Sequence, residues 1–452
     1  MIGKLLRLGR RQLHTIISRE TIKPSCVTHP SHLHTYNLSS IDKLAQHTYM
    51  PLILYYSNND NINLSAHDKA QNMKKSLSQS LARYYPFAGR LQTPTTPYVD
   101  CNDEGVVFVE AKNDSQLETF QHCISEQDET VEQLFADGLF CDNSPHSKSL
   151  IGVKLNHFAC GGVIVGLSMS HKIGDGCTLV SFISHWASVT RYGSTEHKEV
   201  QPLNPHFLHS PSISSILSEA QVISQGYANR VTKKFVFPNT KLSDIKNKVN
   251  ALTLAGSTSL IKNPTRVEVL TSLLYKTAVA AATTKSGCFK PSYLFMPVDI
   301  RNKFVEKLPQ TMVGNFVGIM MIPTRQASET SLNVMVEEMK KEKSQLEGIP
   351  SVEHAAENFK TLKLKLGNED IEDVTQRSYW CSSLCGLPYN KVDFGWGKPM
   401  GASIAVRSAD RIGFLLTDTP DGDGIEALVV LDKEDMEIFE NDKEMLSFCQ
   451  II

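Results

Sequence analysis

A short apolar stretch, a glycine-containing turn and an amphipathic segment follow one another near residue 170. Residues 163–169 form an apolar run, long enough for a buried strand, just after the Gly161-Gly162 pair. Beyond the turn, apolar residues recur at helical spacing from about Thr178 onward: Leu179, Val180, Ile183 and Trp186. Strands and helices that alternate along the chain are typical of mixed α/β domains, so the sequence predicts an α/β fold.

The turn between this strand and this helix carries the residues that we interpret as the chemical centre. It reads Ser-His-Lys-Ile-Gly-Asp-Gly over residues 170–176. Gly174 and Gly176 give the backbone the freedom that a sharp exit from a strand needs. A histidine at such a place can be held by the strand and still face a cavity. We interpret His171 as a catalytic base, and the alternative is a histidine that is satisfied within the core.

A second motif, Asp-Phe-Gly-Trp-Gly at residues 393–397, specifies five positions and two aromatic residues, which composition alone does not explain. Together the two motifs resemble the BAHD family of plant acyl-CoA-dependent acyltransferases, and the resemblance covers nearly the whole chain. The segments most similar to one branch are Ile22-Lys23-Pro24 and Tyr36-Asn37-Leu38-Ser39 with Asp42. That branch contains vinorine synthase, the salutaridinol and deacetylvindoline acetyltransferases, and acylsugar acyltransferases. Further matching segments are Tyr85-Pro86-Phe87-Ala88-Gly89-Arg90, and Asp299-Ile300-Arg301 followed by Gly314-Asn315.

The resemblance implies two similarly folded domains, like chloramphenicol acetyltransferase, with mixed β-sheets and an active-site channel at their interface. A chain of 452 residues is also long for a single core. We expect a basic leader at 1–19, a first domain at 20–205 with the histidine motif, a crossover linker at 206–230 that is rich in proline and serine, and a second domain at 231–452 with the second motif.

Several further elements follow from apolar periodicity. The expected strands are residues 51–56, 106–109, 150–155, 235–237, 292–298 and 317–322. One helix is expected to end at Pro86, with one face formed by Met73, Leu77, Leu81 and Tyr84. Other helices are expected around Leu242, Ile245 and Val249, around Leu273 and Leu274, and around Met335, Met339 and Leu346.

Composition excludes several classes of protein. Lys and Arg number 46 and Asp and Glu 48, a near balance that argues against nucleic acid as a partner. No uncharged apolar run approaches the length of a membrane span. The ten cysteines are scattered without a Cys-x-x-Cys pair, so we expect free thiols in a reducing compartment. There is no His-Glu-x-x-His motif either, and we expect no metal.

The first nineteen residues combine five basic residues with leucine and isoleucine and contain no acid. This pattern is typical of an organellar transit peptide, and the alternative is a frayed leader ahead of the family's usual start. Most family members are cytosolic, so we expect a cytoplasmic protein, with organellar import through the leader as the alternative. We expect a monomer.

A thioester is already activated, so its acyl transfer needs little more than a base. The base removes the proton of an alcohol or amine and then returns it to the departing sulfur. Histidine suits both halves because its unperturbed pKa lies near neutrality. There is no Gly-x-Ser-x-Gly elbow, the best sequence sign of a serine hydrolase, and we expect direct transfer from acyl-CoA with His171 as general base. The indole N–H of Trp396 is a candidate oxyanion donor, although a purely structural role in the Gly-Trp-Gly turn is the interpretation that we favour.

The co-substrate is expected to be acetyl-CoA or another acyl-CoA, with no bound cofactor. No phosphate-binding loop of the Walker A type is present, so the residues that contact CoA are not predicted. The acceptor is expected to be a small-molecule alcohol. By resemblance to its branch we favour acetylation of a hydroxyl of an alkaloid or terpenoid, then a sugar or small alcohol, then an amine. The alternative from another class is a relative that uses the scaffold for binding or other chemistry.

The remaining motif residues are expected to support the site structurally. We predict that Asp175 points away from the substrate, because Gly174 and Gly176 uncouple its direction from His171. Arg301 matches the family arginine that pairs with this aspartate, so the resemblance implies a buried ion pair between the two. The structural-support residues are thus Asp175, Gly176, Arg301, Asp393, Gly395, Trp396 and Gly397.

Overall fold

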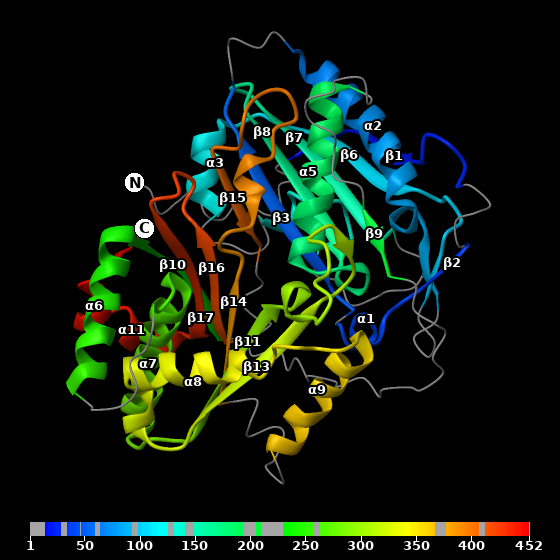
Figure 1. Cartoon of the computed structure of the whole chain (residues 1–452). Coiled ribbons are helices and arrows are strands. Elements are labelled where there is room, and N and C mark those ends of the chain that lie inside the picture. Colours follow the sequence, from blue (N-terminus) through cyan, green and yellow to red (C-terminus); the bar gives the residue numbers. More distant parts are fainter. Residues whose placement is uncertain are drawn as a thin grey trace, which may run out of the picture. The chain divides into compact units, whose positions relative to one another are not determined.

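The computed structural model describes residues 14–28, 34–45, 47–58, 64–92, 98–124, 131–140, 149–193, 205–208, 229–255, 263–366, 377–405 and 412–451 (Figure 1). These residues form two compact units. The first unit takes the described parts of 14–38, 45–208 and 388–405, and the second takes those of 39–44, 229–387 and 412–451. Both units combine a mixed β-sheet with helices, which confirms the predicted α/β class.

The first unit is built on a six-stranded sheet with the order β1-β6-β7-β8-β3-β15. The β6–β7 pair is parallel and the other neighbours are antiparallel. The strands are β1 (Thr15–Ile22), β3 (Tyr49–Tyr56), β6 (Val106–Asn113), β7 (Ile151–Phe158), β8 (Val163–Ser170) and β15 (Gly401–Ile404). Every residue of β7 and β8 is buried, so these strands are covered on both faces and their sequences do not alternate.

Two helices of this unit, α2 (Ala66–Arg83) and α5 (Gly176–Tyr192), pack against each other. A third, α3, spans Leu117–Ile124. In α2 the residues predicted to form one face, Met73, Leu77 and Leu81, are all fully buried. The helix begins at a capping box in which Ser65 and Asp68 each accept the other's backbone amide, and a 3-10 turn at Tyr85–Ala88 follows its end, as Pro86 requires.

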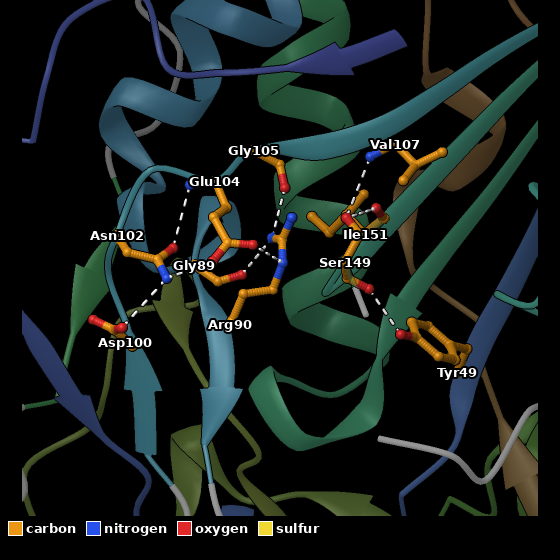
Figure 2. Close-up of polar contacts among 10 residues, drawn as sticks. All are labelled: Tyr49, Gly89, Arg90, Asp100, Asn102, Glu104, Gly105, Val107, Ser149 and Ile151. Carbon is orange, nitrogen blue, oxygen red and sulfur yellow. Dashed lines mark hydrogen bonds and ion pairs between the residues drawn. The ribbon is translucent and has the colours of Figure 1, made fainter. Parts of the chain in front are cut away.

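The first unit also contains a three-stranded sheet with the order β2-β5-β4. Its members are β2 (Thr35–Asn37), β4 (Arg90–Gln92) and β5 (Tyr98–Asp100). The two-residue strand β9 (His206–Phe207) belongs to this unit as well. Arg90 fixes the start of β4: its Nη1 donates to the carbonyl oxygens of Gly89 and Gly105 at 2.8 and 2.7 Å, and its Nε pairs with Glu104 at 2.9 Å (Figure 2). A Cβ at Gly89 would lie 2.3 Å from the Asp100 carbonyl oxygen. These contacts hold the Tyr85–Arg90 segment in place, so its role is structural.

The second unit has a seven-stranded sheet with the order β13-β11-β14-β16-β17-β10-β18. Its strands are β10 (Arg230–Pro238), β11 (Ser292–Asp299), β13 (Val317–Thr324), β14 (Ser378–Ser383), β16 (Gly413–Asp418), β17 (Gly424–Asp432) and β18 (Gln450–Ile451). The short strand β12 spans Met312–Val313.

The described helices of the second unit are α1 (Ser40–Leu44), α6 (Asn239–Ala255), α7 (Arg266–Ser286), α8 (Leu332–Ser344), α9 (Val352–Leu366), α11 (Lys433–Phe439) and α12 (Lys443–Leu446). Helix α7 packs on strands β14 and β16 and also contacts α6, α8 and α11 (Figure 1). It begins at a capping box formed by Thr265 and Glu268. Among the described residues, no helix is long and apolar enough to cross a membrane.

All six strands and all the helices predicted from periodicity are present, with ends that differ by a few residues. The helix after the histidine motif begins at Gly176, two residues before the predicted start. The helix predicted around Met335, Met339 and Leu346 is α8, which ends at Ser344, so Leu346 lies beyond it. The predicted linker at 206–230 lies mostly outside the described residues.

Two predicted domain boundaries are corrected by the structure. Residues 15–19 do not belong to a leader, because they pair with β6 as part of β1, and His14 is buried. The second motif lies in the second half of the chain, but it does not belong to the second domain as predicted. Residues 388–405 return to the first unit, where β15 pairs with β3, as the orange and blue strands of Figure 1 show.

Candidate active site

His171 lies where β8 ends, in a 3-10 turn that spans His171–Ile173. Its backbone amide donates to the carbonyl oxygen of Thr48 at 2.8 Å, and the amide of Ser170 donates to that of Leu150 at 2.8 Å. Among residues 163–175, only His171 is not buried. The strand thus holds the backbone of a residue that is only partly buried. The role of His171 as the base stays a prediction.

Asp175 is the N-cap of α5. Its Oδ1 accepts a hydrogen bond from the backbone amide of Thr178 at 2.9 Å, and the residue is 4% exposed. The carboxylate also lies at the positive end of the helix dipole, which stabilises a negative charge. Gly174 is required for space, since a Cβ there would lie 2.5 Å from the Cγ2 of Thr178. Asp175 therefore has a structural task within its own unit.

Arg301 is completely buried in the second unit. Its Nη1 pairs with Asp299 Oδ1 at 3.0 Å, and its Nη2 donates to the carbonyl oxygens of Met312 and Gly314 at 3.0 and 3.1 Å. The guanidinium also lies 4.8 Å from the ring centroid of Phe316. A buried charge held this firmly is compatible with the structural role that the sequence predicted. The ion pair between Asp175 and Arg301 stays a prediction.

Two of the segments that carried the family resemblance meet in the second unit. Asp42, 1% exposed, accepts hydrogen bonds from the backbone amide and the side-chain amide of Asn315 at 2.7 and 2.9 Å, and from the amide of Ser39 at 2.9 Å. Burial raises the pKa of the Asp42 carboxyl even though these donors oppose the shift. Asp42 thereby fixes the segment whose Gly314 carbonyl binds Arg301.

Asp393 binds two backbone amides of its own motif. Its Oδ1 accepts hydrogen bonds from the amides of Gly395 and Gly397 at 2.8 and 3.0 Å, and its Oδ2 pairs with Arg191. Gly395 and Gly397 have φ values of +101° and +111°, which other residues rarely adopt. The motif's aspartate and glycines thus form a tight turn. Sequence reasoning missed Arg191, because an arginine at a helix end has no local signature.

The aromatic residues of the second motif are packed into the first unit. Phe394 meets Trp186 of α5 edge to face at 4.9 Å and stacks on Trp396 at 5.5 Å. Trp396, 4% exposed, also meets Tyr56 at 6.0 Å. The Tyr56 hydroxyl donates to the Val392 carbonyl oxygen at 3.0 Å, and its pKa is raised well above the usual value by burial and by the charge of Asp393.

The second motif lies far from His171. Tyr49 pairs with Ser170 at one end of β3, whereas Tyr56, which contacts Trp396, is seven residues further along the strand. At roughly 3.3 Å per residue this separation is about 23 Å. The indole N–H of Trp396 is buried and has no acceptor within the described residues. This distance supports the structural interpretation of Trp396 over the oxyanion donor.

Within the described ranges, no group of three or more His, Cys, Asp or Glu side chains is placed to hold a metal ion. The cysteines whose side chains the structure describes form no disulfide with one another. Burial raises the pKa of Cys101 and Cys381 to about 12, so both stay protonated at neutral pH.

Comparisons with known proteins agree on one family. A sequence model described as the Transferase family matches residues 14–446. The chain is 33% identical to akuammiline synthase 1 from Alstonia scholaris, over 96% of this chain and 97% of that protein. It is 30% identical to limonoid 7-O-acetyltransferase from Citrus sinensis, over 96% and 98% of the two chains. The crystal structure of vinorine synthase has a TM-score of 0.80 at 26% identity, over 96% and 98% of the two chains.

Substitutions at Asp175 separate its helix cap from the predicted ion pair with Arg301. Asn keeps a helix cap but removes the charge, whereas Ala removes both. We expect Asp175→Asn to lower stability by about 3–5 kcal/mol, the typical cost of breaking a buried ion pair. Asp175→Ala should lose about 1 kcal/mol more, the usual value of a cap. Chemical unfolding of both variants, with Arg301→Ala for comparison, measures this. An Asn variant as stable as the wild type would rule out the ion pair.

Proposed function

This chain belongs to the Transferase family, the acyl-CoA-dependent acyltransferases known as BAHD, and we propose that it acetylates a hydroxyl of a plant specialised metabolite by direct transfer, with His171 as general base. It is an acyltransferase with acyl-CoA as its co-substrate. The observation that carries the proposed role of His171 is its setting: it is the one residue of 163–175 that is not buried, at the end of a strand that holds its backbone.

The chemistry needs one proton to move twice. An imidazole nitrogen of His171 accepts the proton of the acceptor hydroxyl while the oxygen attacks the thioester carbonyl carbon. The resulting tetrahedral intermediate expels the CoA sulfur, and the imidazolium gives the proton to that sulfur. One residue thus serves as base and then as acid, and a histidine can do both near neutral pH. The oxyanion of the intermediate needs fixed donors, and the only candidate from the sequence, Trp396, is one for which we favour a structural role.

Direct transfer is supported by the lack of a serine-nucleophile motif in the sequence. The chain has no Gly-x-Ser-x-Gly elbow. The buried thiols of Cys101 and Cys381 stay protonated because burial raises their pKa to about 12, and a protonated thiol is a poor nucleophile. The thioester is itself reactive enough for an alcohol that has lost its proton. A covalent acyl-enzyme is therefore not needed.

For the acceptor, we infer a hydroxyl on a bulky alkaloid or terpenoid. The name of limonoid 7-O-acetyltransferase, a relative of 30% identity over nearly the whole chain, describes an O-acetylation on such a scaffold. A sugar or small alcohol is the second candidate and an amine the third. We also infer a cytoplasmic monomer, since free thiols suit a reducing compartment.

A substrate panel tests the proposed function. The purified protein is incubated with acetyl-CoA and with hydroxylated alkaloids, terpenoid alcohols, sugars or amines, and CoA release and product mass are followed. We expect turnover on a bulky alkaloid or terpenoid alcohol and no product without acceptor. Turnover only on sugars or only on amines would overturn the acceptor class. No turnover with any acyl-CoA would favour a binding protein that has kept the scaffold.

His171→Ala tests the base. A general base contributes roughly 10²–10⁴ in rate, and the loss of proton return to sulfur adds to this, so turnover should become unmeasurable. The melting temperature should stay within about 3 °C of the wild type, since the backbone hydrogen bond to Thr48 does not depend on the side chain. His67→Ala, which changes an exposed histidine on α2, is the control and should keep full activity. A His171→Ala rate above a tenth of the wild-type rate would contradict the assignment.

A further inference from the structure

The backbone around His171 is closed into a ring by three hydrogen bonds. The amide of His171 donates to Thr48, and the amide of Ser170 donates to Leu150, each at 2.8 Å. The third bond comes from a side chain: the hydroxyl of Tyr49 donates to the carbonyl oxygen of Ser149 at 2.7 Å (Figure 2). Since 48–49, 149–150 and 170–171 are neighbours in the chain, these contacts form one continuous loop.

This hydrogen-bonded loop of backbone lies at the ends of three strands. Strand β3 begins at Tyr49, β7 begins at Ile151, and β8 ends at Ser170. The regular pairing of β7 with β8 stops at Ile151 and Met169. Strand ends open more readily than strand centres, because fewer neighbouring bonds hold them. A side chain that ties two of these ends together therefore limits their movement where His171 is placed.

Tyr49 is well suited to this task. It is 7% exposed, and its ring packs in a small cluster with Val109, Ala136 and Leu139. The ring position is thus fixed by apolar contacts, which aim the hydroxyl at the end of β7.

The acceptor of this bond is also fixed. The Oγ of Ser149 donates to the carbonyl oxygen of Ile151 at 2.5 Å and accepts from the amide of Val107 at 3.3 Å (Figure 2). Ser149 thereby joins β7 to β6, and its buried carbonyl points at Tyr49. The hydroxyl of Tyr49 thus connects the start of β3, next to Thr48, to the segment that leads into β7.

We propose that Tyr49 is a positioning residue for the reaction, and that its hydrogen bond to Ser149 fixes the backbone on which His171 stands. The proposal rests on the proposed role of His171 as the base. Proton transfer depends steeply on geometry, and a displacement of about 1 Å at a reacting group can cost about a hundredfold in rate. Tyr49 does not touch the substrate in this scheme. It acts only through the position of His171.

Tyr49→Phe tests this by removing one oxygen atom and leaving the apolar ring in place. We expect kcat to fall about tenfold to a hundredfold, while KM for acetyl-CoA changes less than about threefold. Hydrogen–deuterium exchange should become faster in peptides that cover residues 164–174. The pH at which the rate is half-maximal should stay the same, because no charged group has been removed.

Tyr55→Phe is the matched control. Tyr55 lies on the same face of β3, six residues away, is 8% exposed, and also has a hydroxyl contact, to Ser403 Oγ at 3.4 Å. Its variant should keep kcat within about twofold of the wild type and leave exchange at 164–174 unchanged. If the two variants lost activity equally, or if Tyr49→Phe lowered the melting temperature without lowering kcat, Tyr49 would have only a structural role.

A second variant covers the case in which Tyr49→Phe does not fold. Ser149→Ala keeps the carbonyl acceptor but removes the Oγ contacts that hold it, so a smaller fall in kcat is expected. Full activity of Ser149→Ala would then overturn the proposal. The assignment of the base is tested separately: an active His171→Ala would overturn the proposed function itself. An inactive His171→Ala beside a fully active Tyr49→Phe would overturn the positioning role alone.

Discussion

The hydrogen bond from the Thr178 amide to the Asp175 carboxylate fixes the start of α5, just after the turn that follows β8. It stabilises the first turn of the helix whose other end holds the second motif, through Trp186 and Arg191. Without a cap at this point, the turn that carries His171 could lengthen or shorten, and the helix could shift along the sheet. The two sequence motifs, more than 200 residues apart, are thus joined through a single helix of one unit.

This arrangement divides the work between the two motifs. The first presents a partly exposed histidine on a fixed backbone, which is what a base for acyl transfer from a thioester requires. The second forms a closed turn around Asp393 and buries its two aromatic rings near Tyr56, which lies about 23 Å along β3 from Tyr49. This separation supports a structural role for the second motif, and that role stays a prediction.

The sequence predicted what depends on local pattern. The strands with long apolar runs, the face of α2 and the start of α5 were all visible in residue spacing. What it missed depends on distant partners: β15 pairs with a strand about 350 residues earlier, and Arg191 pairs with Asp393 across about 200 residues. The start of the body was missed because β1 is a largely exposed edge strand without a clear apolar pattern. Tyr49 looks like any strand tyrosine until its hydroxyl partner is known.

Direct passage of the acyl group from CoA to the acceptor is the central step of the proposed mechanism. Intact-protein mass spectrometry tests it most directly: the wild-type protein is incubated with acetyl-CoA, freed of it, and then given the acceptor. We expect no covalent acetyl group on the protein before the acceptor is added, and no product afterwards. An acetylated protein that passes its acetyl group to the acceptor at the rate of turnover would contradict it.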